Sequence, residues 1–258
     1  MPESLGHYLD FAVETAYLAG RLTLGYFQTG VHSELKADQS LVTVADRRAE
    51  ELIRGRIEKQ YPGHAIVGEE YGRTETAGAD HRWFVDPIDG TASFVHGVPL
   101  YSVLIALEIE GVVQVGVAYF PGLNEMLSAA TGQGCWWNGR RASVAPTSSL
   151  AQSVVTFSDV ANFAKYGRSA EWQRIEQATY YHAGWGDAYG HALVATGRVE
   201  LMLDPIMNAW DCGPFPPILA EAGGYFGDWQ GNVTIYGNEA LSTTQTLLPD
   251  VLDLVRGA

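Results

Sequence analysis

Two aspartates, Asp86 and Asp89, lie three residues apart, where a run of strand-forming apolar residues meets a proline and a glycine. Pro87 cannot donate a hydrogen bond to a β-ladder, so Asp86 is expected at the carboxyl edge of a sheet, with a turn directly after it. Proline also favours an extended conformation in the residue before it. The two carboxylates are therefore predicted to converge on one point.

The residues between and after these aspartates add further polar groups. The Ile88 carbonyl lies between the two carboxylates, and Gly90 allows the backbone to approach a ligand closely. Hard oxygen ligands at short spacing suit Mg²⁺ or Mn²⁺ rather than zinc. Thr91 adds a hydroxyl group, and the backbone amides that open the next segment can bind an anion. A metal beside an anion site indicates phosphate chemistry.

The same pattern, Asp-Pro-x-Asp-Gly, also forms ordinary surface turns, and the motif alone does not decide between a turn and a metal site. A calcium-binding loop is excluded, because that loop needs acids or amides at its third and fifth positions and a glutamate at its twelfth. Here those positions hold Ile88, Gly90 and Gly97.

The composition is that of a folded globular protein, with 47% hydrophobic and 18% charged residues. The 258 residues suffice for one domain or two closely joined halves. A net charge of -14 disfavours binding to nucleic acid or anionic lipid. Cys135 and Cys212 match no zinc spacing and fit a reducing cytoplasm. No membrane-spanning run is found, and Met1–Asp10 does not read as a signal peptide.

Periodicity predicts the elements that position the motif. Apolar residues recur at three- and four-residue steps over residues 5–27, which predicts an amphipathic helix, and Lys36 follows in a loop. Thr43 and Asp46 have the spacing of a helix start. Asp46 is there either an acid that complements the helix dipole or a functional group.

A second group of acids follows another predicted strand. Residues 65–67 form a short apolar run that leads into Gly68, Glu69 and Glu70. Acids at two strand ends that share one sheet edge are the arrangement expected of a metal centre in an α/β fold. Paired glutamates in a solvated loop are the alternative.

The second half of the chain presents further acids at predicted helix starts. Asp187 and Asp211 each precede a helical pattern, where an acid either caps the helix or faces a site. His96, just past the central motif, is either a metal ligand or a surface or packing residue, and the second interpretation is preferred for a lone histidine in a turn. The predicted elements are hairpin turns at 110–111 and 138–139, strands at 154–157, 179–182 and 199–203, and helices at 188–196, after Asp211 and at 246–255. No Walker, G-x-G-x-x-G or G-x-S-x-G motif is found.

Three separated acidic motifs together resemble the inositol monophosphatase family. They are Gly68-Glu69-Glu70, Asp86-Pro87-Ile88-Asp89-Gly90-Thr91 and Trp210-Asp211, with further matches at residues 41–46, 138–139 and 221–224. The resemblance spans nearly the whole chain. It implies a single α/β (α+β layered) domain, residues 1–258, built as an αβαβα sandwich with halves 1–145 and 146–258.

The resemblance also implies a cytoplasmic, Mg²⁺-dependent phosphatase that acts on a small phosphate monoester with two or three metal ions, which Mn²⁺ can replace, and that is commonly a homodimer. It implies one metal bound by Glu70, Asp86 and the Ile88 carbonyl, and a second bound by Asp86, Asp89 and Asp211. Glu70 and Thr91 would orient the attacking water, Asp46 would hold Thr91, and the Gly90 and Thr91 amides would bind phosphate. Lys36 matches a position near the metals.

The segment Gly184-Trp185-Gly186-Asp187 resembles the histidinol-phosphatase branch more than the inositol branch, which has a small neutral residue at the place of Asp187. Histidinol phosphate carries an ammonium and an imidazole group, which Asp187 and Asp204 would attract. Ala183 and Gly213-Pro214 depart from the usual pattern. The alternatives are an inositol-1-monophosphatase, a broad sugar-phosphate phosphatase, a 3′-phosphoadenosine 5′-phosphate nucleotidase and a non-catalytic scaffold.

Overall fold

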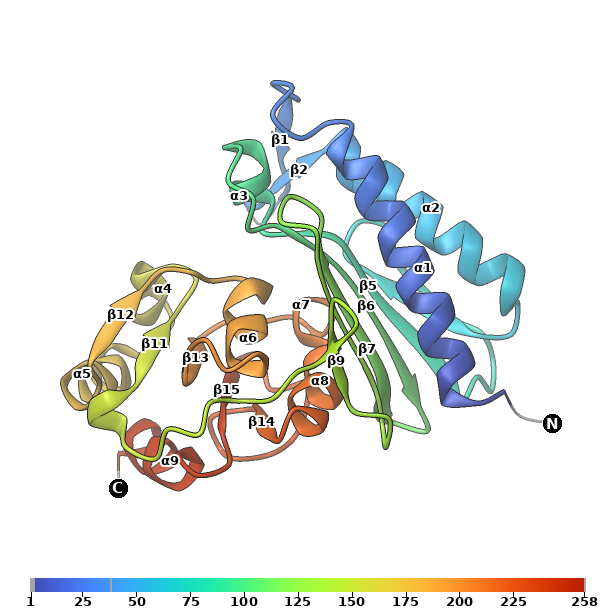
Figure 1. Ribbon diagram of the computed structural model, residues 1–258. Coiled ribbons are helices and arrows are strands. Elements are labelled where there is room, and N and C mark those ends of the chain that lie inside the picture. Colours follow the sequence, from blue (N-terminus) through green and yellow to red (C-terminus); the bar gives the residue numbers. More distant parts are fainter. Residues whose placement is uncertain (1–2, 38, 258) are drawn as a thin grey trace.

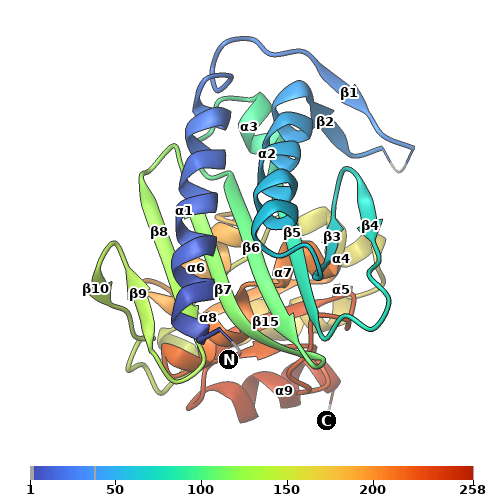
Figure 2. The same ribbon diagram turned by 90° about the vertical axis from the view of Figure 1, so that its right-hand side faces the viewer.

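The computed structural model describes residues 3–37 and 39–257, which form five alternating layers of helices and sheets (Figure 1). Helices α1 (Leu5–Leu24) and α2 (Val44–Gln60) form the first layer and lie side by side across one face of a large sheet (Figure 2). The layered α/β class predicted from the sequence is confirmed. None of the described helices is long and apolar enough to cross a membrane.

The second layer is an eight-stranded sheet with the order β10-β9-β8-β7-β6-β5-β3-β4. All neighbouring strands in it are antiparallel except β3 and β5, which are parallel. Its strands are β3 (Ala65–Gly68), β4 (Gly72–Thr74), β5 (His81–Asp89), β6 (Ser102–Ile109), β7 (Val112–Phe120), β8 (Glu125–Ala130), β9 (Cys135–Trp137) and β10 (Arg140–Arg141). The parallel pair brings the carboxyl ends of β3 and β5 to one edge.

Three helices, α6 (Ala188–Ala195), α7 (Ala209–Cys212) and α8 (Phe215–Glu221), separate this sheet from a five-stranded sheet of order β12-β11-β13-β15-β14 (Figure 1). The second sheet contains β11 (Val154–Thr156), β12 (Tyr181–Ala183), β13 (Leu201–Asp204), β14 (Gly224–Gly227) and β15 (Ala240–Thr244). Helices α4 (Val160–Lys165), α5 (Ser169–Ala178) and α9 (Leu248–Arg256) cover its outer face. Smaller elements are β1 (Ser33–Leu35), β2 (Leu41–Thr43), α3 (Thr91–Val95) and the 3₁₀ turn Leu150–Gln152.

Alternation along the strands distributes the side chains between separate cores. On β5, Trp83 and Val85 pack under α1 and α2, whereas Phe84 faces the middle helices. Full burial of a large apolar side chain contributes about 1.5–3 kcal/mol. Because the middle layer is packed against both sheets, we propose that the two halves form one domain.

Two sequence-based predictions need correction. Strand β5 does not end at Asp86: it continues to Asp89, with a register shift between Asp86, opposite Leu104, and Asp89, opposite Ser102. A bulge accommodates Pro87, which could not donate to a regular ladder.

The second correction concerns Asp211. It lies in the short helix α7 and not at the start of the longer helix that contains Ile218. Pro214, Pro216 and Pro217 lie between Asp211 and Ile218 and supply no N–H for a continuous helix, so the chain breaks into α7 and α8.

Candidate active site

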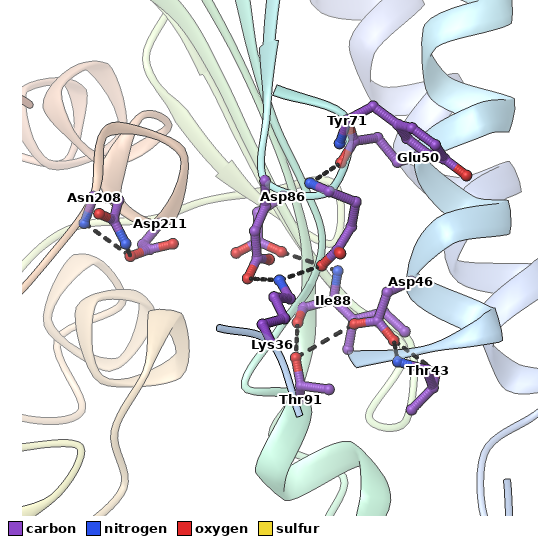
Figure 3. A network of polar contacts seen from close by, with 12 residues as sticks. Lys36, Thr43, Asp46, Glu50, Tyr71, Asp86, Ile88, Thr91, Asn208 and Asp211 are labelled. Carbon is purple, nitrogen blue, oxygen red and sulfur yellow. Dashed lines mark hydrogen bonds and ion pairs between the residues drawn. The ribbon is translucent and has the colours of Figure 1, made fainter. Parts of the chain in front are cut away.

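A polar cavity of about 390 Å³ opens where β5 meets α7. Figure 3 shows Asp86, Ile88 and Thr91 on one side of it and Asn208 and Asp211 on the other. Residues from both halves of the chain line the cavity: Lys36, Ser40, Glu69, Asp86, Ile88, Asp89, Gly90, Thr91, Asn208, Trp210 and Asp211. The acidic motifs at residues 69, 86–89 and 211 thus meet in one place.

The parallel pairing of β3 and β5 determines which glutamate reaches this cavity. Val67 and Phe84 are register partners, and both side chains lie in the core between the sheets. Side chains two residues further along each strand point the same way, so Glu69 shares that face with Asp86. The Glu69 N–H continues the pairing by donating to the Val85 carbonyl over 3.2 Å.

Glu70, one residue further, is held on the side of α2. Its backbone N–H donates to Oε2 of the buried Glu50 over 2.7 Å, and its Oε1 accepts from Lys36 Nζ over 2.6 Å. The same Nζ donates to Glu69 Oε1 over 2.7 Å. A Cβ added at Gly68 would lie 2.0 Å from Glu50 Oε1, so glycine is required there. Of the two glutamates, Glu69 lines the cavity and Glu70 does not.

The charges of these groups depend on one another. Burial lowers the pKa of Lys36, but its contacts with Glu69 and Glu70 outweigh burial and shift the pKa upward overall. Burial raises the pKa of Glu70 to about 7, although Lys36 opposes that shift. Lys36 therefore remains a cation beside two glutamates.

Asp86 and Asp89 occupy the bulged end of β5. Asp86 Oδ1 accepts from the Ile88 N–H over 3.0 Å, and Asp89 Oδ2 accepts from Ser102 Oγ over 3.2 Å. Burial raises the pKa of Asp86 well above its usual value, and the charge of Glu69 raises it further. Burial also raises the pKa of Asp89. Each carboxylate keeps an oxygen that is not used in these bonds.

Asp211 approaches from α7 on the other side. Its Oδ2 accepts from the backbone N–H of Asn208 over 2.8 Å and from the Asn208 side chain over 3.1 Å. The predicted helix-capping function is therefore present, and it uses one oxygen only. Burial raises the pKa of Asp211 to about 6. We call Glu69, Asp86, Asp89 and Asp211 the carboxylate cluster.

Asp46 likewise combines both of its predicted functions. Its Oδ2 accepts from the Thr43 N–H over 2.8 Å and from Thr43 Oγ1 over 2.6 Å, which makes a capping box for α2. Its Oδ1 lies 3.3 Å from Thr91 Oγ1, whose single proton is shared between Asp46 and the Ile88 carbonyl oxygen 3.1 Å away. Thr91 is thus tied to the start of α2.

Asp187 precedes α6 but makes no side-chain cap. Instead, the Ala188 N–H donates to Asp89 Oδ2 over 2.8 Å. The Asp187 backbone has φ 53° and ψ -156°, a conformation that costs a residue other than glycine about 1–3 kcal/mol. Its Oδ2 lies 2.9 Å from the place of a Cβ at Gly90, where φ is 77°. The capping interpretation of Asp187 is wrong, and its carboxylate faces the central motif.

The remaining predicted residues lie away from the cavity lining. Asp204 is 2% exposed, so burial raises its pKa well above the usual value, and polar contacts with Ser158 oppose that rise. Ser158 Oγ also accepts from the Asp187 N–H over 2.8 Å. His96 is exposed, with Nδ1 2.8 Å from the Ala92 carbonyl, in line with the packing interpretation. We call Ser158, Asp187 and Asp204 the leaving-group side.

The donor set fits a hard divalent cation. Its members are carboxylates and one carbonyl, and burial together with mutual repulsion raises the pKa values of all four acids, so a bound cation would relieve the repulsion. Within residues 3–37 and 39–257, no three His, Cys, Asp or Glu side chains already stand close enough to coordinate one ion. Coordination of one ion by three of these carboxylates would require the side chains to rotate toward one another.

Sequence reasoning missed three residues of this region: Glu69, Asn208 and Ser158. Glu69 could have been found from the two-residue alternation, because it follows Val67 as Asp86 follows Phe84. Asn208 is the capping partner of Asp211 and carries the N-cap pattern three residues before an acid. Ser158 gave no signal, because its contacts with residues 187 and 204 are set by the tertiary fold.

Comparison with known proteins places the chain in a family. The sequence model of the inositol monophosphatase family matches residues 4–254. A histidinol-phosphatase of Chlorobaculum parvum is 42% identical over 90% of both chains, and an inositol-1-monophosphatase of Mesorhizobium japonicum is 32% identical over 89% of this chain and 88% of its own. The solved structure of a Thermotoga maritima IMPase superimposes with a TM-score of 0.86, at 31% identity, over 97% of each chain.

The chain therefore belongs to the inositol monophosphatase family. Members of this family are phosphatases that hydrolyse phosphate esters.

Proposed function

We propose that the protein is a Mg²⁺-dependent phosphomonoesterase whose substrate is histidinol phosphate. The observation that carries the phosphatase assignment is the convergence of the carboxylate cluster from β3, β5 and α7 on one cavity. The observation that carries the substrate is Asp187, a carboxylate beside the central motif that is not used as a helix cap.

The metal ligands follow from the position of each acid. We propose Glu69, in place of Glu70, with Asp86 and the Ile88 carbonyl for one ion, and Asp86, Asp89 and Asp211 for a second. When bound, such ions neutralise the phosphate, acidify a water molecule and stabilise the departing alkoxide. Mn²⁺ satisfies the same oxygen ligands.

The protein groups orient the reactants. Thr91 Oγ1, held by Asp46 Oδ1 and the Ile88 carbonyl, is placed to accept a hydrogen bond from the attacking water while it donates to Asp46. The amides of Gly90 and Thr91 begin α3 and bind the phosphate oxygens. Lys36 holds Glu69 and supplies positive charge at the cavity edge.

Asp187 favours a cationic leaving group. Its carboxylate lies beside Gly90, next to the proposed phosphate site, so an ammonium or imidazolium group on the alcohol would meet a negative charge. The 42% identical relative named a histidinol-phosphatase supports the same substrate.

A panel assay tests the proposal. Phosphate release would be measured with histidinol phosphate, inositol 1-phosphate and 3′-phosphoadenosine 5′-phosphate, each with Mg²⁺ and with a chelator. We expect release to require Mg²⁺ and kcat/KM to be highest for histidinol phosphate. If kcat/KM were about tenfold higher for inositol 1-phosphate than for histidinol phosphate, histidinol phosphate would be rejected as the substrate. A tenfold ratio corresponds to a difference of ~1.4 kcal/mol in activation free energy. No release from any ester would favour a scaffold.

Inositol 1-phosphate is the second candidate, supported by the relative named an inositol-1-monophosphatase and by the Thermotoga maritima structure. A cytoplasmic homodimer remains a prediction, and light scattering would determine the oligomeric state.

A further inference from the structure

A chain of buried polar side chains runs behind the leaving-group side. His191 on α6 and Ser242 on β15 are both 0% exposed, and His191 Nδ1 lies 2.7 Å from Ser242 Oγ. The other ring nitrogen, Nε2, lies 3.8 Å from Oδ2 of Asp204 on β13. At 3.8 Å these two atoms are too far apart for a hydrogen bond, and neither has a hydrogen-bond partner. An unpaired buried polar atom is costly, so this pairing requires a reason.

The three side chains do not form a hydrolytic site. Asp204 is 2% exposed, and no substrate could reach Ser242 Oγ behind the sheet. The imidazole of His191 packs against Phe215 and Phe226, with ring centroids 4.8 and 5.4 Å away. A phenylalanine side chain would fill the same space, so packing alone does not explain why residue 191 is a histidine.

His191 can present an N–H group to the unpaired Oδ2 atom of Asp204. Burial lowers the pKa of His191 to about 3, so the ring is neutral and has one N–H. With Ser242 Oγ donating to Nδ1, that N–H lies on Nε2 and faces Asp204 Oδ2. The Nε2–H group then faces Asp204 at 3.8 Å, beyond hydrogen-bonding distance, and Ser158 contacts the same carboxyl group.

Ser158 connects this chain to the strained residue of the proposed active site. Its Oγ accepts from the Asp187 N–H over 2.8 Å, and its single hydroxyl proton can be donated to either the Asp187 or the Asp204 carboxyl group. A backbone at φ 53° persists only where its surroundings fix it. The order of contacts is Ser242, His191, Asp204, Ser158 and Asp187.

We propose that His191 is a positioning residue that acts through Asp204 and Ser158 to hold the Asp187 carboxylate beside Gly90, and thereby sets the preference for a cationic leaving group. The inference rests on the proposed function and adds a residue to it. His191 touches neither phosphate nor metal ligand in this arrangement, so its removal should change selectivity more than turnover.

The test compares two esters in the Mg²⁺-loaded full-length enzyme. His191→Phe keeps the ring volume and removes the N–H. We expect kcat/KM for histidinol phosphate to fall about tenfold and kcat/KM for glycerol 2-phosphate, whose alcohol is uncharged, to change less than about twofold. His191→Gln, which keeps an N–H donor, should restore part of the ratio. Tyr189→Phe, which removes a polar group from the same helix, should leave it unchanged.

Two further variants keep the outcome decisive. Ser158→Ala interrupts the same chain from the other side and should reproduce the loss of ratio even if His191→Phe folds poorly. In an Asp187→Asn background, His191→Phe should change the ratio no further, since both act on one carboxylate. Equal losses for the two esters, or additive losses in the double variant, would overturn the proposal.

A crystal structure of His191→Phe separates this proposal from the proposed function, because it requires no activity. We expect residue 187 to leave its positive φ or its carboxylate to leave Gly90. An unchanged Asp187 would overturn the positioning role even in an active enzyme. A displaced Asp187 in a protein without phosphatase activity would retain the role and reject the function.

Discussion

The carboxylate cluster and the leaving-group side, which lies outside the cavity lining, are assembled by different means. In the cluster, Glu69 directly follows β3 and Asp86 lies within the parallel strand β5, so alternation and pairing place them together. On the leaving-group side, Asp187 has an unfavourable backbone conformation, and its N–H donates to Ser158 Oγ, 29 residues away in sequence. The comparison indicates that regular structure brings the carboxylate cluster together, whereas tertiary contacts hold the Asp187 carboxylate beside Gly90.

The largest effect is expected at Asp86, which is proposed to bind both ions. Asp86→Asn keeps the side-chain volume and removes a charge from each metal site, so metal affinity and water acidity should fall together. We expect kcat to fall about 10³-fold or more for every ester, a loss of ~4 kcal/mol. Calorimetric Mn²⁺ titration and steady-state kinetics measure both quantities. Two ions bound at parental affinity, with more than about a tenth of kcat, would refute the shared ligand.

The two glutamates provide a matched pair within the cluster. Glu69→Gln should lower metal affinity and kcat about a hundredfold, because Glu69 lines the cavity. Glu70→Gln should lower them about tenfold at most, because Glu70 acts through Lys36. Both variants would be titrated with Mn²⁺ under identical conditions. A larger loss of metal affinity and kcat in Glu70→Gln than in Glu69→Gln would indicate that Glu70 is the metal ligand.

Asp187→Asn tests the other region, with a smaller expected effect. It keeps the shape of the side chain and removes the charge, so the ratio of kcat/KM for histidinol phosphate over glycerol 2-phosphate should fall about tenfold, ~1.4 kcal/mol. Asp253→Asn on α9 removes the same charge from the outer layer and serves as the control. An equal loss for both esters would assign Asp187 to turnover and remove the distinction between the two regions.

The smallest effect concerns the stability of the metal-free protein. Burial raises the pKa of Glu70 from 4.5 to about 7 and that of Asp211 from 3.8 to about 6. Over that range the folded state holds protons that the unfolded state has released, so stability should fall as pH rises from about 4 to 7. Saturating Mg²⁺ should offset the loss at pH 7. Thermal melts with and without a chelator measure this, and a metal-free Tm that rises over the window would contradict it.

The family resemblance implied the layered fold, and periodic patterns such as that over residues 5–27 predicted most elements because they carry local information. It did not predict that β5 continues past Pro87 or that α7 and α8 are separate, since both depend on how neighbouring chains accommodate proline. It assigned Glu70 where strand alternation favours Glu69.

The contacts of the leaving-group side could not be predicted from local sequence patterns. The sequence predicted that Asp187 caps the start of α6. Instead, the Ala188 N–H donates to the carboxylate of Asp89, 99 residues earlier in the sequence. His191 sits in an apolar stretch of α6, and only the packed structure shows that it faces Asp204. Such contacts are set when the two sheets come together around the middle helices.

Anomalous diffraction from crystals grown with Mn²⁺ and inorganic phosphate tests the proposed metal site most directly. We predict Mn²⁺ peaks within coordination distance of Asp86, one of them shared with Glu69 and the Ile88 carbonyl and another with Asp89 and Asp211, and a phosphate against the Gly90 and Thr91 amides. Peaks at Glu70 but not Glu69, or a cavity that binds phosphate without any Mn²⁺, would contradict it.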